Sequence, residues 1–405
     1  MTERRASDES PTGPSGALVG VRVLDFCSFI AGSYGAMMLG DLGADVVKVE
    51  PLGGDPSRYW GPFLAGESRL FQGWNRNKRS LSLDLKAAPA HQVVEKLLAG
   101  ADVVMVNFRP GVAEKLGIGY EDVRAINPEV VYLSSTAFGD RGPYRLRPGY
   151  DPVLQTMSGA AKLHERFCGD VHINAIAVSD FQAATLAVAG VCAALYHRER
   201  SGEGQKVETS LLHAVMSVQS HAFIEALEVE EDEAAGIYPY KMFATADGPI
   251  FVACGTDRFW QLLCEALERE DLAADARFRS NPQRVAAAAE LEAVLAPIFR
   301  SRASLDWEAL LLEKGVPCAA ARSSAEFFDD PQVAALGMSR TVEHTKLGKM
   351  RVMGVPMEFG RTPGAIQRAA PLLGEHSVEV LEELGFAPGR IEELVASGVV
   401  AVAPV

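Results

Sequence analysis

The strongest constraint on the fold is a repeated alternation of short hydrophobic strand patterns with helical patterns. Strand patterns are expected at Val21–Phe26, Ala44–Glu50, Ser80–Lys86, Asp102–Phe108, Val130–Thr136 and Gln205–Leu212. Helical patterns lie at Tyr34–Leu42, Ala88–Ala99, Tyr120–Ile126 and Phe181–Arg200. Strands that alternate with helices predict a mostly parallel, doubly wound sheet, so we place this chain in the α/β class.

A second region of different texture begins near Asp232. It contains one strand pattern, and several helical patterns follow it: Ile250–Cys254, then Arg258–Leu267, Pro282–Phe299 and Leu305–Glu313. Strand-like alternation returns over Met338–Phe359, and a last helix is expected at Ser377–Leu384. The pattern and the length of 405 residues predict two domains, the second smaller and more helical.

Composition excludes several functions. The net charge of −14 argues against a nucleic-acid partner, which needs a basic surface. We expect no membrane partner, because no run reaches the roughly 18 apolar residues that span a bilayer. The six cysteines form no C-x-x-C pair and the histidines no H-x-x-x-H spacing. These spacings predict free thiols, a cytoplasmic location and no metal site.

One carboxylate, Asp180, stands among apolar and small residues in Ala175–Thr185. Ser179 and Gln182 have the spacing of a capping box, which predicts that Ser179 is the N-cap of a long apolar helix. An acid in the first turn faces the positive end of the helix dipole, which favours its ionised form. Such a carboxylate can be a nucleophile, or it can serve only to stabilise the helix.

Two further segments carry candidate chemistry. The cations Arg76, Lys78 and Arg79 fall within four residues and form either a phosphate site or a solvated surface loop. Asn107–Gly111 follows a strand, at the edge where open α/β sheets bind ligands. A dinucleotide site is not favoured, because Ile30 takes the place of the first glycine of the fingerprint.

The chain resembles the class III (CaiB/BaiF) CoA-transferases, a family that also includes α-methylacyl-CoA racemases. The resemblance is carried by motifs that occur in family order along nearly the whole chain. They are Gly20–Phe26, Leu39–Pro51, Gly53–Pro56, Asn75–Ser80, Asn107–Gly111, Gly149–Asp151, Ser179–Asp180, Ser201–Val207 and Pro371–His376.

The resemblance implies a domain organisation and an assembly. It implies a tail over residues 1–17, a Rossmann-like large domain over 18–225 that binds CoA, a small inserted α+β domain over 226–330, and a return segment over 331–405 that completes the large domain. It also implies an interlocked homodimer, and a heteromer with a paralogue is the alternative. Coenzyme A and acyl-CoA are expected as substrates, a carboxylic acid is the acceptor, and no cofactor is expected to be tightly bound.

The resemblance also assigns roles to residues. Asp180 falls on the catalytic aspartate, and Asp151 falls on an auxiliary acid near the reacting centre. The positions expected to line or adjoin the CoA site are Leu83, Lys86, Asn107, Phe108, Lys115, Arg79 and Arg147.

The implied function is ping-pong transfer of CoA from an acyl-CoA to a carboxylate through a covalent intermediate on Asp180. In the racemases a histidine stands at position 150, where this chain has Tyr150. That departure counts against racemisation, which needs two proton-transfer groups on opposite faces of the α-carbon. A second departure is Val106, where an acid often precedes the Asn-Phe pair. A 2-methylacyl-CoA racemase or epimerase and a non-catalytic CoA-binding subunit remain the alternative functions.

Overall fold

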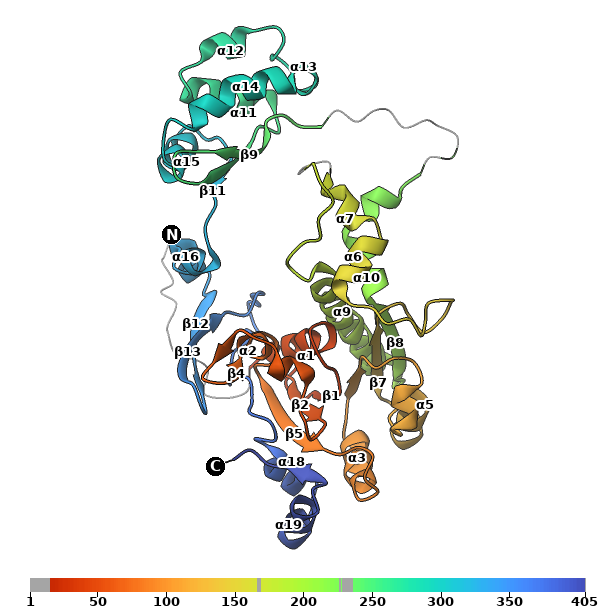
Figure 1. Cartoon of the computed structure of the whole chain (residues 1–405). Helices are drawn as coiled ribbons and strands as arrows, with labels where there is room; N and C mark the ends of the chain where they lie inside the picture. Colours follow the sequence, from red (N-terminus) through yellow and green to blue (C-terminus); the bar gives the residue numbers. More distant parts are fainter. Residues whose placement is uncertain (1–14, 166–168, 226, 228–235, 405) are drawn as a thin grey trace. The chain divides into compact units, whose positions relative to one another are not determined.

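The computed structural model describes residues 15–165, 169–225, 227 and 236–404 (Figure 1). It divides into two compact units, Met1–Phe223 with Ala334–Val405, and Ile224–Val333. The boundaries expected from the sequence were residues 226 and 330. Residues 1–14 of the expected tail, and Cys168 among the thiols, lie outside the described residues.

The first unit is built on a seven-stranded sheet. Its strand order is β14-β5-β2-β1-β6-β7-β8. The strands are β1 (Arg22–Asp25), β2 (Asp45–Glu50), β5 (Lys78–Leu83), β6 (Val103–Val106), β7 (Val131–Thr136), β8 (Gln205–Ser210) and β14 (Val400–Ala401). All neighbours pair in parallel except β14, which is antiparallel to β5. The predicted α/β class with a parallel-dominated sheet is therefore confirmed.

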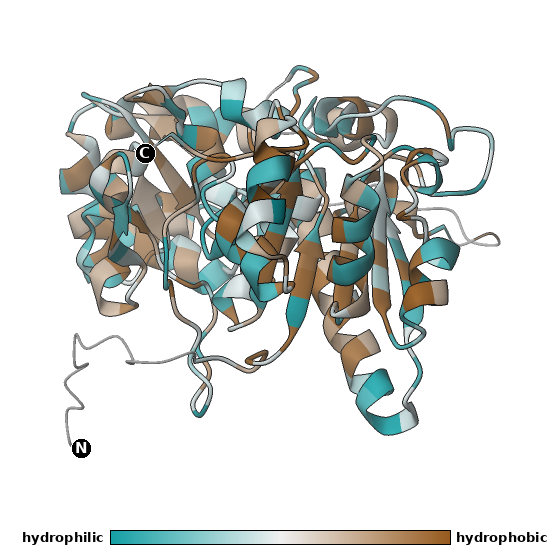
Figure 2. Ribbon diagram, turned by 90° about the horizontal axis from the view of Figure 1, so that it is seen from below, coloured by the Kyte–Doolittle hydropathy of each residue, from teal (hydrophilic) through white to brown (hydrophobic). Residues whose placement is uncertain are grey.

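Helices cover both faces of this sheet because successive strand residues point to opposite sides. On β1, Leu24 packs in a core with α3 (Ala90–Ala99) and α5 (Tyr120–Ile126). Its neighbour Val23 packs in a second core with α1 (Ala31–Asp41) and α9 (Val178–Ser201). Figure 2 shows helices that carry both hydrophobic and hydrophilic residues, as expected where one face of a helix meets a sheet.

The end of the chain returns to the first unit. The hairpin of β12 (Ser339–His344) and β13 (Gly348–Met353) is followed by α18 (Ser377–Glu383) and α19 (Pro388–Ala396). Both helices pack into the same core as α3, and β14 then extends the sheet. Residues more than 300 apart in the sequence thus share one hydrophobic core.

The second unit contains a three-stranded antiparallel sheet. Its strands are β9 (Tyr240–Ala244), β10 (Pro249–Ala253) and β11 (Cys318–Ala320). Its helices are α11 (Asp257–Ala266), α12 (Glu270–Ala274), α13 (Asn281–Ala286), α14 (Ala288–Phe299), α15 (Ser304–Glu313) and α16 (Ser324–Phe328). The prediction of a single helix over Pro282–Phe299 is wrong. The helix is interrupted at Ala287, which caps the end of α13 and the start of α14.

The other elements are short. They are α2 (Arg69–Trp74), α4 (Val112–Lys115), α6 (Asp151–Met157), α7 (Ala160–Leu163), α10 (Leu211–Val218), α17 (Pro331–Ala335), the strands β3 (Phe63–Leu64) and β4 (Glu67–Ser68), and two 3-10 turns, η1 (Pro56–Tyr59) and η2 (Ser220–Phe223).

Helix α9 corrects one expectation. By length and composition alone it is apolar enough to cross a membrane, whereas the sequence was expected to contain no segment that could do so. In the fold α9 packs against α1, α10 and the strands β7 and β8. A core helix passes the same test of length and composition, and these contacts are those of a core helix.

Candidate active site

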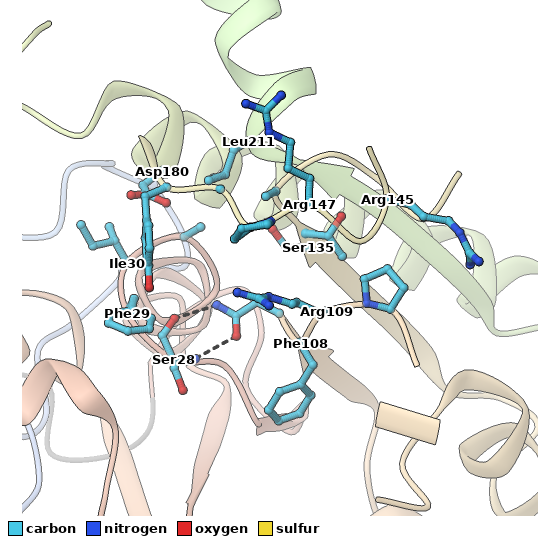
Figure 3. Close-up of a pocket in the computed structure, with 18 of the residues that line it drawn as sticks. Ser28, Phe29, Ile30, Phe108, Arg109, Ser135, Arg145, Arg147, Asp180 and Leu211 are labelled. Carbon is cyan, nitrogen blue, oxygen red and sulfur yellow. Dashed lines mark hydrogen bonds between the residues drawn. The ribbon is translucent and has the colours of Figure 1, made fainter. Parts of the chain in front are cut away.

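A cavity of about 350 Å³ lies at the carboxyl ends of β1, β6 and β7. Strand β1 connects to β2 on one side and has β6 as its neighbour on the other, so the strand order reverses at this point. Ligands of open α/β sheets bind in the crevice that such a reversal leaves. The cavity is lined by residues 28–31 after β1, 107–110 after β6, 135–137 at the end of β7, 145, 147–150, and by Trp60, Asp180 and Leu211 (Figure 3).

Asp180 reaches this cavity from the first turn of α9. The helix begins at Val178 after the cap residue Ala177, so the predicted capping box is wrong. The Ser179 hydroxyl does not cap its own helix but donates to a carboxylate of another element, Asp151, while Gln182 donates to Ser217. Within the described part of the chain, no hydrogen bond or ion pair engages the Asp180 carboxylate.

The Asp151 carboxylate binds the first turn of α9. Its Oδ1 accepts from the backbone N–H of Ser179 at 2.7 Å, and its Oδ2 accepts from Gln155 Nε2 at 2.6 Å. The side chain is 3 % exposed and does not line the cavity. Asp151 therefore does the capping that the sequence assigned to Ser179, because the fold brings the start of α6 against the start of α9.

The environment of Asp180 favours its neutral form. Burial raises its pKa, and the negative charge of Asp151 raises it further, to about 7. The helix N-terminus was expected to offset burial and keep the carboxylate ionised at neutral pH. The net shift is upward instead, so the protonated form of Asp180 is favoured relative to an ordinary carboxylate.

Asn107 and Phe108 also line the cavity, together with Arg147. The Asn107 side chain binds Ser28 twice: its Oδ1 accepts from Ser28 N at 2.9 Å, and its Nδ2 donates to Ser28 O at 2.7 Å. These two bonds are dashed in Figure 3. Asn107 thus joins the turn after β1 to the turn after β6, and the structure shows it as part of the cavity's framework.

Three arginines, Arg109, Arg145 and Arg147, line the same cavity. Among the described residues none of them is paired with a carboxylate, whereas the aromatic faces of Phe138 and Tyr144 lie 5.6 and 5.3 Å from the Arg147 guanidinium. Unpaired guanidinium groups around a cavity attract an anionic ligand and bind carboxylate or phosphate in a bidentate manner.

The basic cluster of the sequence has a different place in the structure. Arg76, Lys78 and Arg79 are each at most 5 % exposed, so neither the phosphate site nor the solvated loop describes them. Arg79 pairs with Asp45 at 2.7 Å and with two glutamates of α18. Its guanidinium is thereby occupied in joining β5 to β2 and α18, and this favours a structural role over the predicted contact with CoA.

Lys86 and Lys115 line a second cavity, of about 580 Å³, beside α3 and α4. Leu83 lines neither cavity, because its side chain is fully buried in the core between the sheet and α3. The predicted CoA positions are therefore distributed over two cavities and the protein interior. Their contacts with CoA stay predictions.

Sequence reasoning missed part of the cavity wall. Phe29 and Trp60, whose ring centroids are 4.9 Å apart, both line it, as does Arg145. Trp60 comes from the segment after η1, which no strand or helix pattern linked to this edge of the sheet. No group of three histidine, cysteine, aspartate or glutamate side chains within the described ranges is arranged to hold a metal ion.

A carboxylate and three arginines that have no ion-pair partner among the described residues thus line one cavity at the switch point of a parallel sheet, an arrangement that favours an anionic ligand. Residues 18–377 match the family described as CoA-transferase family III, and the chain belongs to that family. It is 33% identical to the mouse succinyl-CoA:glutarate CoA-transferase, over 95% of this chain and 90% of that protein.

Two more comparisons agree with this assignment. The chain is 36% identical to the succinyl-CoA:mesaconate CoA-transferase of Haloarcula hispanica, over 93% of this chain and 99% of that one. The crystal structure of a CaiB/BaiF family protein from Brucella suis superposes with a TM-score of 0.80 at 32% identity, over 91% of this chain and all of that one. The predicted family is confirmed, and the protein is a CoA-transferase.

Proposed function

We propose that this enzyme transfers CoA from an acyl-CoA to a carboxylic acid through a covalent intermediate on Asp180. The observation that carries the proposal is a cavity-lining carboxylate that no described side chain engages. An acid that stabilised only the fold would be expected to have partners, as buried polar groups do.

The reaction begins when an Oδ atom of Asp180 attacks the thioester carbonyl carbon of the donor. The C–S bond breaks, CoA thiolate leaves, and an acyl–aspartyl anhydride remains. The thiolate then attacks the aspartyl carbonyl carbon, which gives an aspartyl–CoA thioester and releases the donor acid. The acceptor carboxylate attacks that thioester, and the same steps in reverse yield the new acyl-CoA and free Asp180. No ATP is needed, because each covalent intermediate conserves the thioester energy.

We further propose that the exchanged acids are dicarboxylic acids. Two of the relatives above are named for succinyl-CoA. Arg109, Arg145 and Arg147, which pair with no carboxylate in the part of the chain that the structure describes, supply positive charge for a second carboxylate. Initial rates with dicarboxylic acceptors should exceed those with monocarboxylic acids of equal chain length. Arg145→Gln should reduce that preference, and equal rates for both acceptor classes would contradict the assignment.

The central experiment replaces Asp180 with alanine. Transfer should be lost while CoA binding, measured by calorimetry, is retained. In the unaltered enzyme incubated with acyl-CoA, mass spectrometry should detect a hydroxylamine-sensitive CoA adduct on the peptide that contains Asp180. Retained turnover in Asp180→Ala would exclude the covalent role.

A racemase is distinguished by one further measurement. Deuterium exchange at the α-carbon of a 2-methylacyl-CoA, with no acceptor acid present, would reveal proton transfer, and we expect none. Activity of the chain expressed alone would exclude the non-catalytic subunit. The homodimer, the CoA contacts and the cytoplasmic location stay predictions.

A further inference from the structure

The turn Cys27–Phe29 between β1 and α1 enters the wall of the Asp180 cavity. Side chains hold its backbone at each step. The N–H of Cys27 donates to Asp25 Oδ1 at 2.9 Å, and its carbonyl accepts from Lys48 Nζ at 2.8 Å. The Asn107 side chain accepts from the N–H of Ser28 and donates to its carbonyl. Every backbone polar group from the Cys27 N–H to the Phe29 N–H therefore has a side-chain partner.

Phe29 has the unusual backbone conformation of the turn. Its φ is +62°, in the left-handed region that costs a side-chain-bearing residue on the order of 1 kcal/mol or more. The Phe29 N–H donates to Asp55 Oδ1 at 3.3 Å. The same oxygen accepts from the backbone N–H and the hydroxyl of Ser57, at 2.9 and 2.8 Å. Asp55 thus fixes Phe29 from a segment that follows β2.

A buried lysine holds Asp55 in turn. Lys48 is fully buried, and its Nζ lies 3.0 Å from Asp55 Oδ2 and 3.7 Å from Asp25 Oδ2. Burial opposes ionisation of Asp55, but Lys48 and the Ser57 hydrogen bonds outweigh it and hold the pKa of Asp55 below its usual value. Both charges are thus maintained in the interior, and one lysine bridges the Cys27 carbonyl and the Asp55 carboxylate.

The side chain that this arrangement presents to the cavity is apolar. The Phe29 ring lies 4.9 Å from Trp60 and 6.0 Å edge-on from Tyr150, measured between centroids. All three residues line the cavity with Asp180. In the view of Figure 3, Phe29 and Asp180 lie on the same side of the cavity, away from Arg145. An aromatic wall at this point limits the access of water to a reactive carbonyl.

We propose that Asp55 and Lys48 are positioning residues for CoA transfer, because they hold the Phe29 backbone in the conformation that places its ring in the wall of the Asp180 cavity. They touch no substrate and act through Phe29. The acyl–aspartyl anhydride of the proposed function is the species that the wall protects, so the hydrolysis measurement below rests on that function.

The test compares Asp55→Asn with Asp41→Asn. Asp41 is as deeply buried, at 1 % exposure, and pairs with Arg76 at 2.6 Å, but unlike Asp55 it makes no hydrogen bond to the Cys27–Phe29 turn among the described residues. Transfer with acceptor and hydrolysis of acyl-CoA without acceptor are measured for both variants. Asp55→Asn should lower transfer roughly tenfold and raise the ratio of hydrolysis to transfer by a similar factor. Asp41→Asn should leave that ratio unchanged.

A double-mutant cycle isolates the route through Phe29. Phe29→Ala alone should raise the hydrolysis ratio, and adding Asp55→Asn to it should raise the ratio by less than twofold more, because the wall is already lost. Ser57→Ala, which removes one hydrogen bond to Asp55, is the milder variant if Asp55→Asn does not fold, and it should shift the ratio in the same direction.

An unchanged hydrolysis ratio in folded Asp55→Asn or Ser57→Ala, or fully additive effects in the cycle, would overturn the inference. Asp180→Ala separates this failure from failure of the covalent mechanism. If Asp180→Ala abolishes transfer while the ratio in the Asp55 and Ser57 variants stays constant, the positioning role alone is wrong.

Discussion

Two groups of acids in the first unit behave in opposite ways: Asp25 and Asp55, which hold the turn after β1, and Asp180, which lines the cavity. Asp25 and Asp55 are buried beside Lys48, and their pKa values are lowered because the lysine charges outweigh the effect of burial. Asp180 is half-buried and pairs with no cation within the described ranges, and burial together with Asp151 raises its pKa to about 7. Burial alone therefore does not set the pKa values of these three acids: the charges placed beside them differ in sign, and their pKa values shift in opposite directions.

The largest expected effect is the loss of activity when Asp180 is replaced. Asp180→Asn removes the proposed nucleophile but preserves its shape, so kcat should fall on the order of 10⁴-fold or more. Glu199→Gln, which removes an exposed carboxylate from the same helix, is the control and should retain full activity. Steady-state rates of the two variants measure the contrast, and a loss of less than about tenfold in Asp180→Asn would remove the basis for the comparison.

For Lys48 and the acids paired with it, the expected effect is on stability. Lys48→Ala leaves Asp55 buried without its cation, whereas Asp25 keeps Lys78 at 2.7 Å, so the free energy of unfolding should fall by about 3–5 kcal/mol because of the uncompensated Asp55 charge. Lys206→Ala breaks ion pairs with Asp140 and Glu208 whose side chains are partly exposed, and it should cost about 0.2–1 kcal/mol. Urea denaturation of both variants provides the measurement. Equal losses would show that the buried cluster is no more important than a surface pair.

A smaller effect of opposite sign is expected when Asp180 is neutralised. The folded-state pKa of about 7 lies above the ordinary value of 3.8, so the folded protein binds the proton more tightly than the unfolded chain. Ionisation of Asp180 therefore does not lower the free energy of unfolding below pH 3.8, and it lowers it by the full amount above about pH 7. Asp180→Asn should raise the free energy of unfolding at pH 8 by on the order of 2 kcal/mol, and the gain should vanish near pH 4. A destabilised variant at pH 8 would contradict the raised pKa.

The smallest effect concerns the pH dependence of the rate. Because the nucleophile must be ionised, kcat/KM should rise with pH through a midpoint at about 7. Removing the charge of Asp151 removes the second cause of the raised pKa, so Asp151→Asn should move this midpoint down by less than about one unit. The pH–rate profiles of both proteins test this, and an unmoved midpoint would assign the shift to burial alone.

Local patterns predicted the framework well. Each of the six expected strands of the large sheet is present within two or three residues of its predicted bounds, because a buried parallel strand reads as a continuous apolar run. The helix Tyr120–Ile126 has its predicted bounds. The break at Ala287 was not predicted, because the alanine-rich sequence around it favours a helix throughout.

Partners across the fold were not predictable. Arg79 pairs with glutamates about 300 positions away, and Asp151 caps a helix that begins 27 residues later. Neither relation has a local signature, since a cation in a turn has the same sequence whether it faces solvent or a buried carboxylate. The aromatic wall was missed for the same reason: Phe29, Trp60 and Tyr150 meet only when three separate connections are brought to one edge of the sheet.

The sequence by itself determined the order of strands and helices, the place of Asp180 in the first turn of an apolar helix, and the family. These features depend on short-range periodicity and on motifs that remain readable along the chain. The tertiary structure alone decided which charges are paired. It gave Lys48 two carboxylates, and among the described residues it placed no cation in an ion pair with Asp180. Electrostatic energies depend on distance and burial, which only the folded chain defines.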